Sequence, residues 1–457
     1  MKQFEIKKLA EIVAAKVQGD VSGNSTGVSI DSRAIKPGEC FFAIKGQNHD
    51  GHDFVAEVLA RGAACAVVDE NFKGAAKGTL LRVEDTIQAL GDFARAYRKS
   101  LKCKIVAITG SAGKTSTREI THHVLSRHFK CHQAKKSFNN NIGLPLTLLE
   151  LDPDHQVAIV ELGTNSPGEI LHLTKIAQPD IAIVTNAYPA HVEFFGSVDA
   201  IIKEKTTIAD GLGTKGALII NADIPALVEH CRSHKLSFTT FGITANADVR
   251  ASDVKLDGFT SSFAIDGVTV KLPLAGKGNI ENAIAAYAIC KQFCITAKDF
   301  ADNIRSLVSV SMRLEPLALG DVLVISDCYN ANPASMKNAL DLLVRVSGDR
   351  PGRKVFICGP MMELGEHSEY LHRELGEQIA LADVDVVLAI GRFSQIVFDA
   401  AAANTTAAIE THYFENVNSL CDNLANFIKP DDIILVKGSR SARLELAVER
   451  LRQLYAD

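Results

Sequence analysis

The stretch Ile105-Val-Ala-Ile-Thr-Gly-Ser-Ala-Gly-Lys-Thr-Ser-Thr117 joins an apolar run to a glycine-rich turn and then to a helical pattern. The apolar run predicts a buried strand, and the pattern from about Lys114 to His128 predicts a helix. Gly110 and Gly113 would let the backbone curl so that its N–H groups converge on phosphate oxygens. The dipole at the start of the helix would favour the same anion, so the stretch predicts a phosphate-binding loop.

This loop is a shorter version of the general phosphate-loop pattern, because Ile108 stands where that pattern has its first glycine. Lys114 would reach the β- and γ-phosphates, and the Thr115 hydroxyl would ligate Mg²⁺. The alternative is a glycine-rich turn that binds nothing, which the position between strand and helix disfavours. The expected ATP-binding residues of the loop are Gly110, Ser111, Ala112, Gly113, Lys114, Thr115 and Ser116.

Other apolar runs alternate with helical patterns along most of the chain. They are residues 157–160, 181–184, 218–220, 322–326, 355–358, 386–390 and 433–436. Strands that are apolar on both faces and separated by helices indicate a mostly parallel sheet. Residues 246–274 look different and suggest an antiparallel hairpin region. We predict an α/β protein of three domains, with a small α/β domain at 1–100, a central domain at 101–313 and a third at 314–457.

Composition excludes several classes of partner. Lys and Arg number 49 against 54 Asp and Glu, which gives a net charge of -5 without a long basic run. A nucleic-acid footprint needs clustered cations, so nucleic acid is not an expected partner. The ten cysteines are scattered without a CxxC pair, and no apolar run approaches the ~20 residues that span a bilayer. With no leader pattern visible, we expect a reduced, cytoplasmic protein that does not insert into a membrane.

Polar side chains follow the next two predicted strands of the central domain. Glu161 ends one apolar run, and His191 follows the next one. Ligands of open parallel sheets bind at the carboxyl ends of strands, so these residues are candidates for a Mg²⁺–nucleotide site. Taken alone, Glu161 is equally well explained as a solvated carboxylate at a strand end, and His191 is better explained as a structural histidine. By pattern alone, Lys203 and Lys205 are surface lysines of the next helix.

At this point several segments resemble one family, the Mur ligases of peptidoglycan synthesis. The central ones are Thr109-Gly-Ser-Ala-Gly-Lys-Thr-Ser116, Asn139-Asn-Asn-Ile-Gly-Leu-Pro-Leu-Thr147, Glu161-Leu-Gly-Thr-Asn165 and Ala190-His191. The later ones are Asp327-Cys-Tyr-Asn-Ala-Asn-Pro-Ala-Ser-Met336, Met362-Glu-Leu-Gly365 and Val436-Lys-Gly-Ser-Arg-Ser441. They occur in the family's order over essentially the whole chain. The later set resembles the member that adds a dipeptide.

The resemblance implies a central ATPase that uses ATP and Mg²⁺. Lys114, His191 and Lys205 would be catalytic. Thr115, Glu161, His191 and Lys205 would surround the metal ions, with Lys205 matching the lysine that the family carbamylates and Lys203 lying close by. A carbamate turns the ammonium into a carboxylate-like ligand, which explains how a lysine could bind Mg²⁺.

The resemblance also implies where nucleotide and substrates bind. Asn279 and Asn282 would lie beside the adenine, Arg313 at the phosphates and Asp327 at the ribose. Gly278 departs from the family, which usually has His there. An N-terminal domain would hold the UDP-sugar and a Rossmann-like C-terminal domain the incoming dipeptide. The residues implied for substrate binding are Ser32, Arg33, Lys45, Asn139, Asn140, Asn330, Lys437 and Ser439.

The implied reaction is ATP-driven formation of an amide bond between UDP-N-acetylmuramoyl-tripeptide and D-alanyl-D-alanine through an acyl phosphate, by a monomer. One alternative is a Mur ligase that adds a single amino acid. A second is a nucleotide-dependent switch that binds a partner. The switch would need only the phosphate loop and would leave Glu161, His191, Lys205 and the third domain unexplained.

Overall fold

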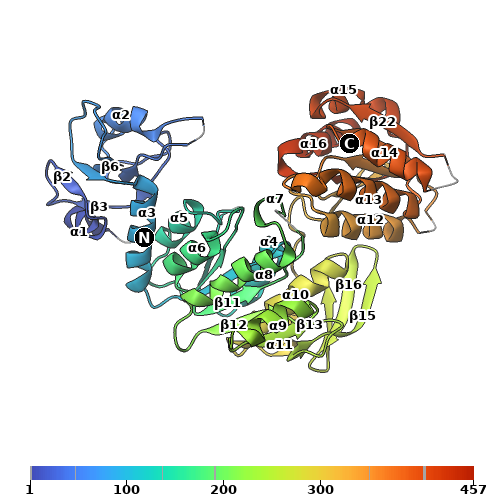
Figure 1. Ribbon diagram of the computed structural model, residues 1–457, viewed down its shortest axis with the longest axis horizontal. Coiled ribbons are helices and arrows are strands. Elements are labelled where there is room, and N and C mark those ends of the chain that lie inside the picture. Colours follow the sequence, from blue (N-terminus) through green and yellow to red (C-terminus); the bar gives the residue numbers. More distant parts are fainter. Residues whose placement is uncertain are drawn as a thin grey trace. The chain divides into compact units, whose positions relative to one another are not determined.

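The computed structural model describes residues 3–46, 48–135, 137–189, 192–348, 350–404 and 408–456 (Figure 1). The chain groups into two compact units. The first comprises residues 1–109, 125–183 and 204–219, and the second comprises residues 110–124, 184–203 and 220–457. The predicted boundaries near 100 and 313 stay predictions.

The first unit begins with a five-stranded sheet of order β2-β7-β6-β5-β4. The strands are β2 (Lys16–Gln18), β7 (Leu80–Val83), β6 (Cys65–Asp69), β5 (Cys40–Phe42) and β4 (Val28–Ser29). Only β2 runs antiparallel to its neighbour. β1 (Phe4–Glu5) pairs with β3 (Asn24–Ser25), and the helical elements are α1 (Ile6–Ile12), η1 (Gly51–Phe54), α2 (Val55–Ala60) and α3 (Thr86–Lys99). This is the small α/β fold expected for the N-terminal part.

A seven-stranded sheet of order β14-β13-β12-β11-β8-β10-β9 follows. Its strands are β8 (Lys104–Thr109), β9 (Cys131–Gln133), β10 (Val157–Glu161), β11 (Ile181–Val184), β12 (Ala217–Asn221), β13 (Thr239–Gly242) and β14 (Val249–Arg250). β8, β10 and β11 are buried beyond their first residues, which is why they read as continuous apolar runs. β10 runs parallel to β8 and places Glu161 opposite Ile108.

Helices and one small sheet complete the central part. The helical elements are α4 (Lys114–Leu125), α5 (Gly143–Leu149), α6 (Glu169–Ala177), α7 (Val192–Phe195), α8 (Val198–Thr206), η2 (Thr207–Gly211), α9 (Pro225–Ser233), α10 (Lys277–Lys291) and α11 (Ala297–Ile304). α4 ends three residues earlier than predicted. β15 (Ser252–Asp257), β16 (Thr260–Ile265) and β17 (Val268–Leu272) form an antiparallel sheet, so the predicted hairpin region is confirmed.

The C-terminal part is a six-stranded sheet of order β18-β19-β23-β20-β21-β22. The strands are β18 (Glu315–Leu319), β19 (Val322–Ser326), β20 (Lys354–Cys358), β21 (Val386–Ile390), β22 (Glu410–Phe414) and β23 (Ile433–Lys437). β18 is antiparallel to β19, and the remaining neighbours are parallel. A parallel sheet with helices on both faces confirms the predicted Rossmann-like domain.

Two hydrophobic cores lie on the two faces of this sheet. Phe356 packs on one face with side chains of α12 (Pro333–Ser347), α13 (Ser368–Leu381) and α14 (Ser394–Ala403). Ile357 packs on the other face with α15 (Val417–Phe427) and α16 (Glu445–Tyr455). The strand alternates its side chains between two apolar layers, which explains why it has no polar face. The short helices η3 (Gly365–His367) and η4 (Arg440–Ala442) lie in loops.

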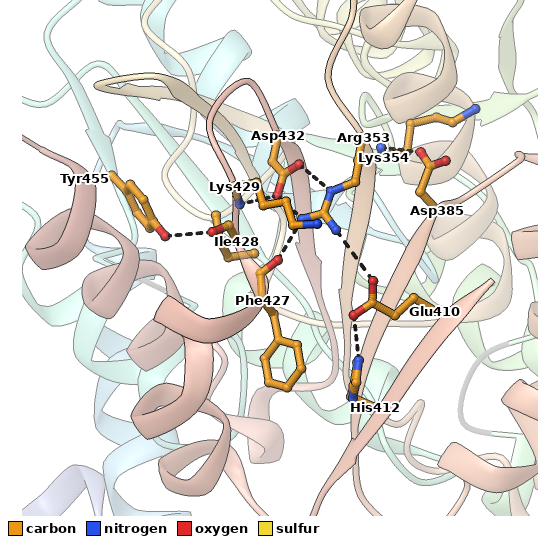
Figure 2. A network of polar contacts seen from close by, with 10 residues as sticks. All are labelled: Arg353, Lys354, Asp385, Glu410, His412, Phe427, Ile428, Lys429, Asp432 and Tyr455. Carbon is orange, nitrogen blue, oxygen red and sulfur yellow. Dashed lines mark hydrogen bonds and ion pairs between the residues drawn. The ribbon is translucent and has the colours of Figure 1, made fainter. Parts of the chain in front are cut away.

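A polar network fixes the amino ends of these strands (Figure 2). The Arg353 guanidinium donates to both carboxylate oxygens of Asp432, at 3.0 and 2.8 Å, and to the Phe427 carbonyl at 2.7 Å. Its third nitrogen lies 3.6 Å from Glu410, whose carboxylate contacts His412. Asp432 is 1% exposed, so a planar, bidentate partner compensates for its desolvation. No helix in the described ranges is long and apolar enough to cross a membrane.

Candidate active site

The phosphate loop is held in a curled conformation by the segment that follows β11. The Ala112 N–H donates to the Asn186 side-chain oxygen at 2.8 Å, and the Thr185 hydroxyl donates to the Ala112 carbonyl at 2.8 Å. The Ser111 hydroxyl donates to the Tyr188 carbonyl at 2.8 Å. These bonds use tertiary partners to fix a glycine-rich turn that would otherwise be flexible.

Two glycines are required by the space around this loop. A Cβ at Gly110 would lie 1.9 Å from the Thr185 hydroxyl oxygen, and one at Gly113 would lie 2.1 Å from the Asn282 side-chain oxygen. Both residues have positive φ, +154° and +80°. Side chains at these positions would therefore break the loop. The Lys114 ammonium donates to the Gly110 carbonyl at 2.6 Å, which folds it over the turn.

The two asparagines expected beside the adenine lie next to the phosphate loop. Asn279 and Asn282 are buried on α10, and the Asn282 amide donates to the Asn279 side chain at 3.3 Å. The Thr117 hydroxyl on α4 donates to Asn282 at 3.4 Å. Two buried side-chain amides next to the phosphate loop are suited to hydrogen bonding with a nucleotide base. Their contact with adenine stays a prediction.

Arg313 reaches the phosphate loop, and its predicted contact with phosphates stays a prediction. Its guanidinium donates to the Thr115 hydroxyl at 3.0 Å and stacks over the Tyr329 ring at 4.4 Å. Thr115 is 8% exposed. A fixed cation beside the hydroxyl predicted to ligate Mg²⁺ fits stabilisation of charge on a triphosphate.

Asp327 and Lys437 form a buried ion pair at the carboxyl ends of β19 and β23. The Lys437 ammonium donates to the Asp327 carboxylate at 2.6 Å and to the Asn330 carbonyl at 3.0 Å. Burial raises the pKa of the Asp327 carboxyl, and the Lys437 charge opposes that shift. The pair holds the 327–330 segment in place. Direct contacts of Asp327 with ribose, and of Asn330 and Lys437 with the dipeptide, stay predictions.

Ser439 lies at the turn after β23, where it starts η4 without capping it through its side chain. Its hydroxyl lies 3.0 Å from the Ser441 hydroxyl, and its N–H donates to the Pro360 carbonyl at 3.0 Å. The Ser439 side chain therefore does not cap η4.

In the first unit, Glu161 and Lys205 are buried, with 1% and 3% of their surfaces exposed. Lys203, by contrast, is exposed. The neighbouring Glu204 accepts hydrogen bonds at 2.8 Å from the N–H groups of Gly168 and Ile170, which anchors the end of α8 to the start of α6. A buried lysine on an anchored helix is not an ordinary surface residue.

Asn139 and Asn140 differ in what they do. The Asn139 carbonyl accepts from the Gly163 N–H at 2.8 Å. Because Gly163 follows Glu161 by two positions, this bond places Asn139 beside the end of β10. The Asn140 side chain accepts from the N–H groups of Ile142 and Gly143, at 3.2 and 2.8 Å, at the start of α5. His191, the predicted imidazole, lies outside the described residues.

The residues predicted for the uridine side lie on loops of the N-terminal sheet. Arg33 makes a bidentate ion pair with Asp31 at 2.9 and 2.8 Å, and its side chain is 88% exposed. These bonds lower the pKa of Asp31 to about 2. The Ser32 carbonyl accepts from Arg61 at 2.7 Å, and Lys45 is exposed at a bridge to Asp50. These residues are accessible to a ligand.

His52 makes two structural hydrogen bonds next to these residues. His52 uses Nδ1 with Asp50 at 2.7 Å and accepts from the Asp69 N–H through Nε2 at 3.0 Å. Both ring nitrogens of His52 are therefore occupied by structural bonds.

Sequence reasoning did not assign roles to Thr185, Asn186 and Tyr188, which shape the phosphate loop. The available signal was a run of polar residues directly after the apolar strand β11. Their partners lie more than 70 positions away, at a separation that local patterns do not encode.

The side chains fit Mg²⁺ and a nucleotide. Gly110 and Gly113, where a Cβ would meet neighbouring side chains, keep the turn before α4 in a tight conformation of the kind that suits phosphate. The buried Glu161 carboxylate in the first unit and the buried Thr115 hydroxyl in the second are each a hard oxygen group of the kind that Mg²⁺ prefers.

Three family models match the chain. They describe the Mur ligase family catalytic domain, at residues 24–98, the Mur ligase middle domain, at 108–290, and the Mur ligase glutamate ligase domain, at 312–440.

Curated relatives match over nearly the full length. UDP-N-acetylmuramoyl-tripeptide--D-alanyl-D-alanine ligases from Bacillus subtilis and Escherichia coli are 33% and 34% identical, with 98% of each chain covered. Among solved structures, MurF from Acinetobacter baumannii has a TM-score of 0.90 at 30% identity, with 99% of both chains covered. MurF from Thermotoga maritima in complex with ADP has a TM-score of 0.82 at 27% identity, with 93% of this chain and 97% of that chain covered.

Proposed function

The chain belongs to the Mur ligase family, and from this premise we propose that it joins D-alanyl-D-alanine to the peptide carboxylate of UDP-N-acetylmuramoyl-tripeptide, using ATP. The observation that carries the proposal is the phosphate loop with Arg313 bound to Thr115 at 3.0 Å. It supports ATP-dependent chemistry. Relatives that bear this substrate pair in their names support the choice of substrates.

The chemistry needs an activated acid, because a carboxylate is a poor electrophile. An oxygen of the tripeptide carboxylate attacks the γ-phosphorus, and the bond to the β-phosphate oxygen breaks, which gives an acyl phosphate and ADP. The amine of D-alanyl-D-alanine then attacks the carbonyl carbon and loses a proton, and inorganic phosphate leaves. Both steps gather negative charge, so positioned cations matter more than a covalent nucleophile.

Each protein group has a role in this scheme. Lys114 and Arg313 stabilise charge on the transferred phosphoryl group. Asn279 and Asn282 orient the base. Bound Mg²⁺ would supply further positive charge, held by Thr115 and Glu161, with a carbamylated Lys205 and His191 as further members of the proposed set.

The remaining parts of the proposal concern substrates and setting. Ser32, Arg33, Lys45, Asn139 and Asn140 serve the UDP-sugar side, and Asn330, Lys437 and Ser439 serve the dipeptide side. We place the reaction in the cytoplasm, where ATP is available, and propose a monomer.

The test is phosphate release from ATP with purified protein and UDP-N-acetylmuramoyl-tripeptide, with and without D-alanyl-D-alanine. We expect release to depend on the dipeptide and not on a single amino acid such as lysine or meso-diaminopimelate. Lys114→Ala should abolish it. Release that ignores every amine acceptor would favour a nucleotide-dependent switch instead, and full ligation by Lys114→Ala would refute the proposed chemistry.

A further inference from the structure

One loop of the C-terminal domain borders the turn that we propose for the dipeptide. We call Gly359–Leu364 the β20–α13 loop. The Gly359 N–H donates to the Lys437 carbonyl at 2.9 Å, and the Pro360 carbonyl accepts from the Ser439 N–H at 3.0 Å. The position of the Lys437–Ser439 turn therefore depends on the conformation of this loop.

The main chain of the next residue, Met361, is bonded by one buried side chain, and the Met361 side chain packs in the core that contains Phe356. His372 on α13 is 1% exposed, and its Nε2 accepts from the Met361 N–H at 3.0 Å. Its Nδ1 lies 2.6 Å from the Ser368 carbonyl oxygen. A carbonyl only accepts and an N–H only donates, so the ring is neutral, with its proton on Nδ1.

The ring is also fixed in its plane. It stacks on Phe393, with centroids 4.2 Å apart and 21° between the planes, and the Arg392 guanidinium lies 4.5 Å from the centroid of Phe393. Burial lowers the pKa of His372 and the Arg392 charge acts in the same direction, while the hydrogen bond to the Ser368 carbonyl opposes the shift. The favoured form of His372 is thus the neutral imidazole, whose Nε2 can accept the hydrogen bond from the Met361 N–H.

We propose that His372 is a positioning residue for the incoming dipeptide: through the Met361 N–H it sets the β20–α13 loop, and through the loop the Lys437–Ser439 turn. This proposal rests on the proposed function. It assigns His372 no contact with substrate. It differs from a general structural role, because it requires the Nε2 acceptor in particular.

Two substitutions separate the two nitrogens of the ring. His372→Gln places an amide oxygen near the Nε2 position and keeps an acceptor for Met361. His372→Asn places its amide near the Nδ1 position and loses that acceptor. We expect His372→Asn to raise the KM for D-alanyl-D-alanine on the order of tenfold, because a small misplacement of binding groups has effects of this size or more. The KM for ATP should change less than about twofold, and His372→Gln should recover most of the loss.

Two control variants test whether an effect on the dipeptide KM comes from the His372 hydrogen bond. His367→Ala removes an exposed histidine from the same segment and should leave the dipeptide KM unchanged. Phe393→Leu removes the stacking surface but keeps both hydrogen bonds, so it should raise the same KM more modestly, and it serves if His372→Asn does not fold. Equal dipeptide KM values for wild type and folded His372→Asn, or equal shifts for ATP and dipeptide, would overturn the proposal. A wild-type protein without dipeptide-dependent phosphate release would instead refute the proposed function.

Discussion

Two lysines on α8 show what a single residue's burial adds to sequence reasoning. Lys203 and Lys205 have the same chemistry and lie two positions apart, and the helical pattern alone places both at the surface. The structure buries Lys205 and exposes Lys203. Burial of a lysine needs a compensating interaction or a modification, and a carbamate would provide one.

Lys205→Ala should lower ligase activity by about 100-fold or more, because even the loss of a residue behind a metal ligand costs 10- to 100-fold. Lys203→Ala, the matched control, should stay within about twofold. The measurement is dipeptide-dependent phosphate release at saturating Mg²⁺. Isotopically labelled bicarbonate should label the wild type and Lys203→Ala but not Lys205→Ala. Equal activities of the two variants would contradict the assignment.

Glu281 on α10 gives a pH-dependent prediction. Burial raises its pKa to about 7 from the model-compound value of 4.5, and nearby Asp223 adds to the shift while Lys277 opposes it. Between pH 4.5 and about 7, the folded state therefore keeps a proton on Glu281 that the unfolded state has already released. Stability associated with this group is present below pH 4.5 and is lost as pH rises through about 7.

At pH 8 the free energy of unfolding of Glu281→Gln should accordingly exceed that of the wild type by up to about 3 kcal/mol. The variant should therefore unfold at a higher urea concentration, and the difference should shrink towards pH 5. Urea unfolding at several pH values checks this. A constant difference between the two proteins across that range would show that Glu281 does not titrate as the structure indicates.

At the scale of whole elements, sequence patterns worked well where both faces of a strand are buried. Apolar runs located β8, β10, β11 and β21 almost to the residue, because a parallel strand between helices has no polar face to blur its boundaries. The end of α4 was placed three residues too late, since a helical pattern does not state where the last hydrogen bond forms.

The candidate site was predictable only in part. Lys114, Thr115 and Glu161 could be proposed from the sequence because they lie at or shortly after the ends of buried strands, and their roles stay predictions. The resemblance to Mur ligases, confirmed by the family models, supplied Arg313 and Asn282. Asn186 was not assigned a role, because its function is to bond a loop 74 positions away. Only the folded chain brings such partners together.

The ion pair between Arg353 and Asp432 joins the amino ends of β20 and β23, and its effect on stability can be tested (Figure 2). Arg353→Ala would leave the Asp432 carboxylate, 1% exposed, without its bidentate partner. We expect a loss of about 3–5 kcal/mol in the free energy of unfolding, the usual effect of breaking a buried pair. Urea denaturation measures it.

The neighbouring Lys354 is the control, because only its backbone N–H joins the network. Lys354→Ala should change stability by less than about 0.5 kcal/mol. Arg353→Ala protein that remains folded should keep its KM for the dipeptide, since Lys437 lies at the opposite end of its strand. A large rise in that KM would mean that the two ends of the sheet are coupled.

At the scale of the whole molecule, the proposed reaction brings together three reactants, and we propose that different domains bind them. An acyl phosphate hydrolyses if water reaches it, so we predict that the domains close around the reactants before the amine attacks. We predict that ATP and both substrates together compact the protein in solution. Small-angle X-ray scattering should show a smaller radius of gyration with a non-hydrolysable ATP analogue, UDP-N-acetylmuramoyl-tripeptide and D-alanyl-D-alanine than with ADP alone. An unchanged radius with all three ligands bound at saturation would rule out closure, and water would then have to be excluded by local loops.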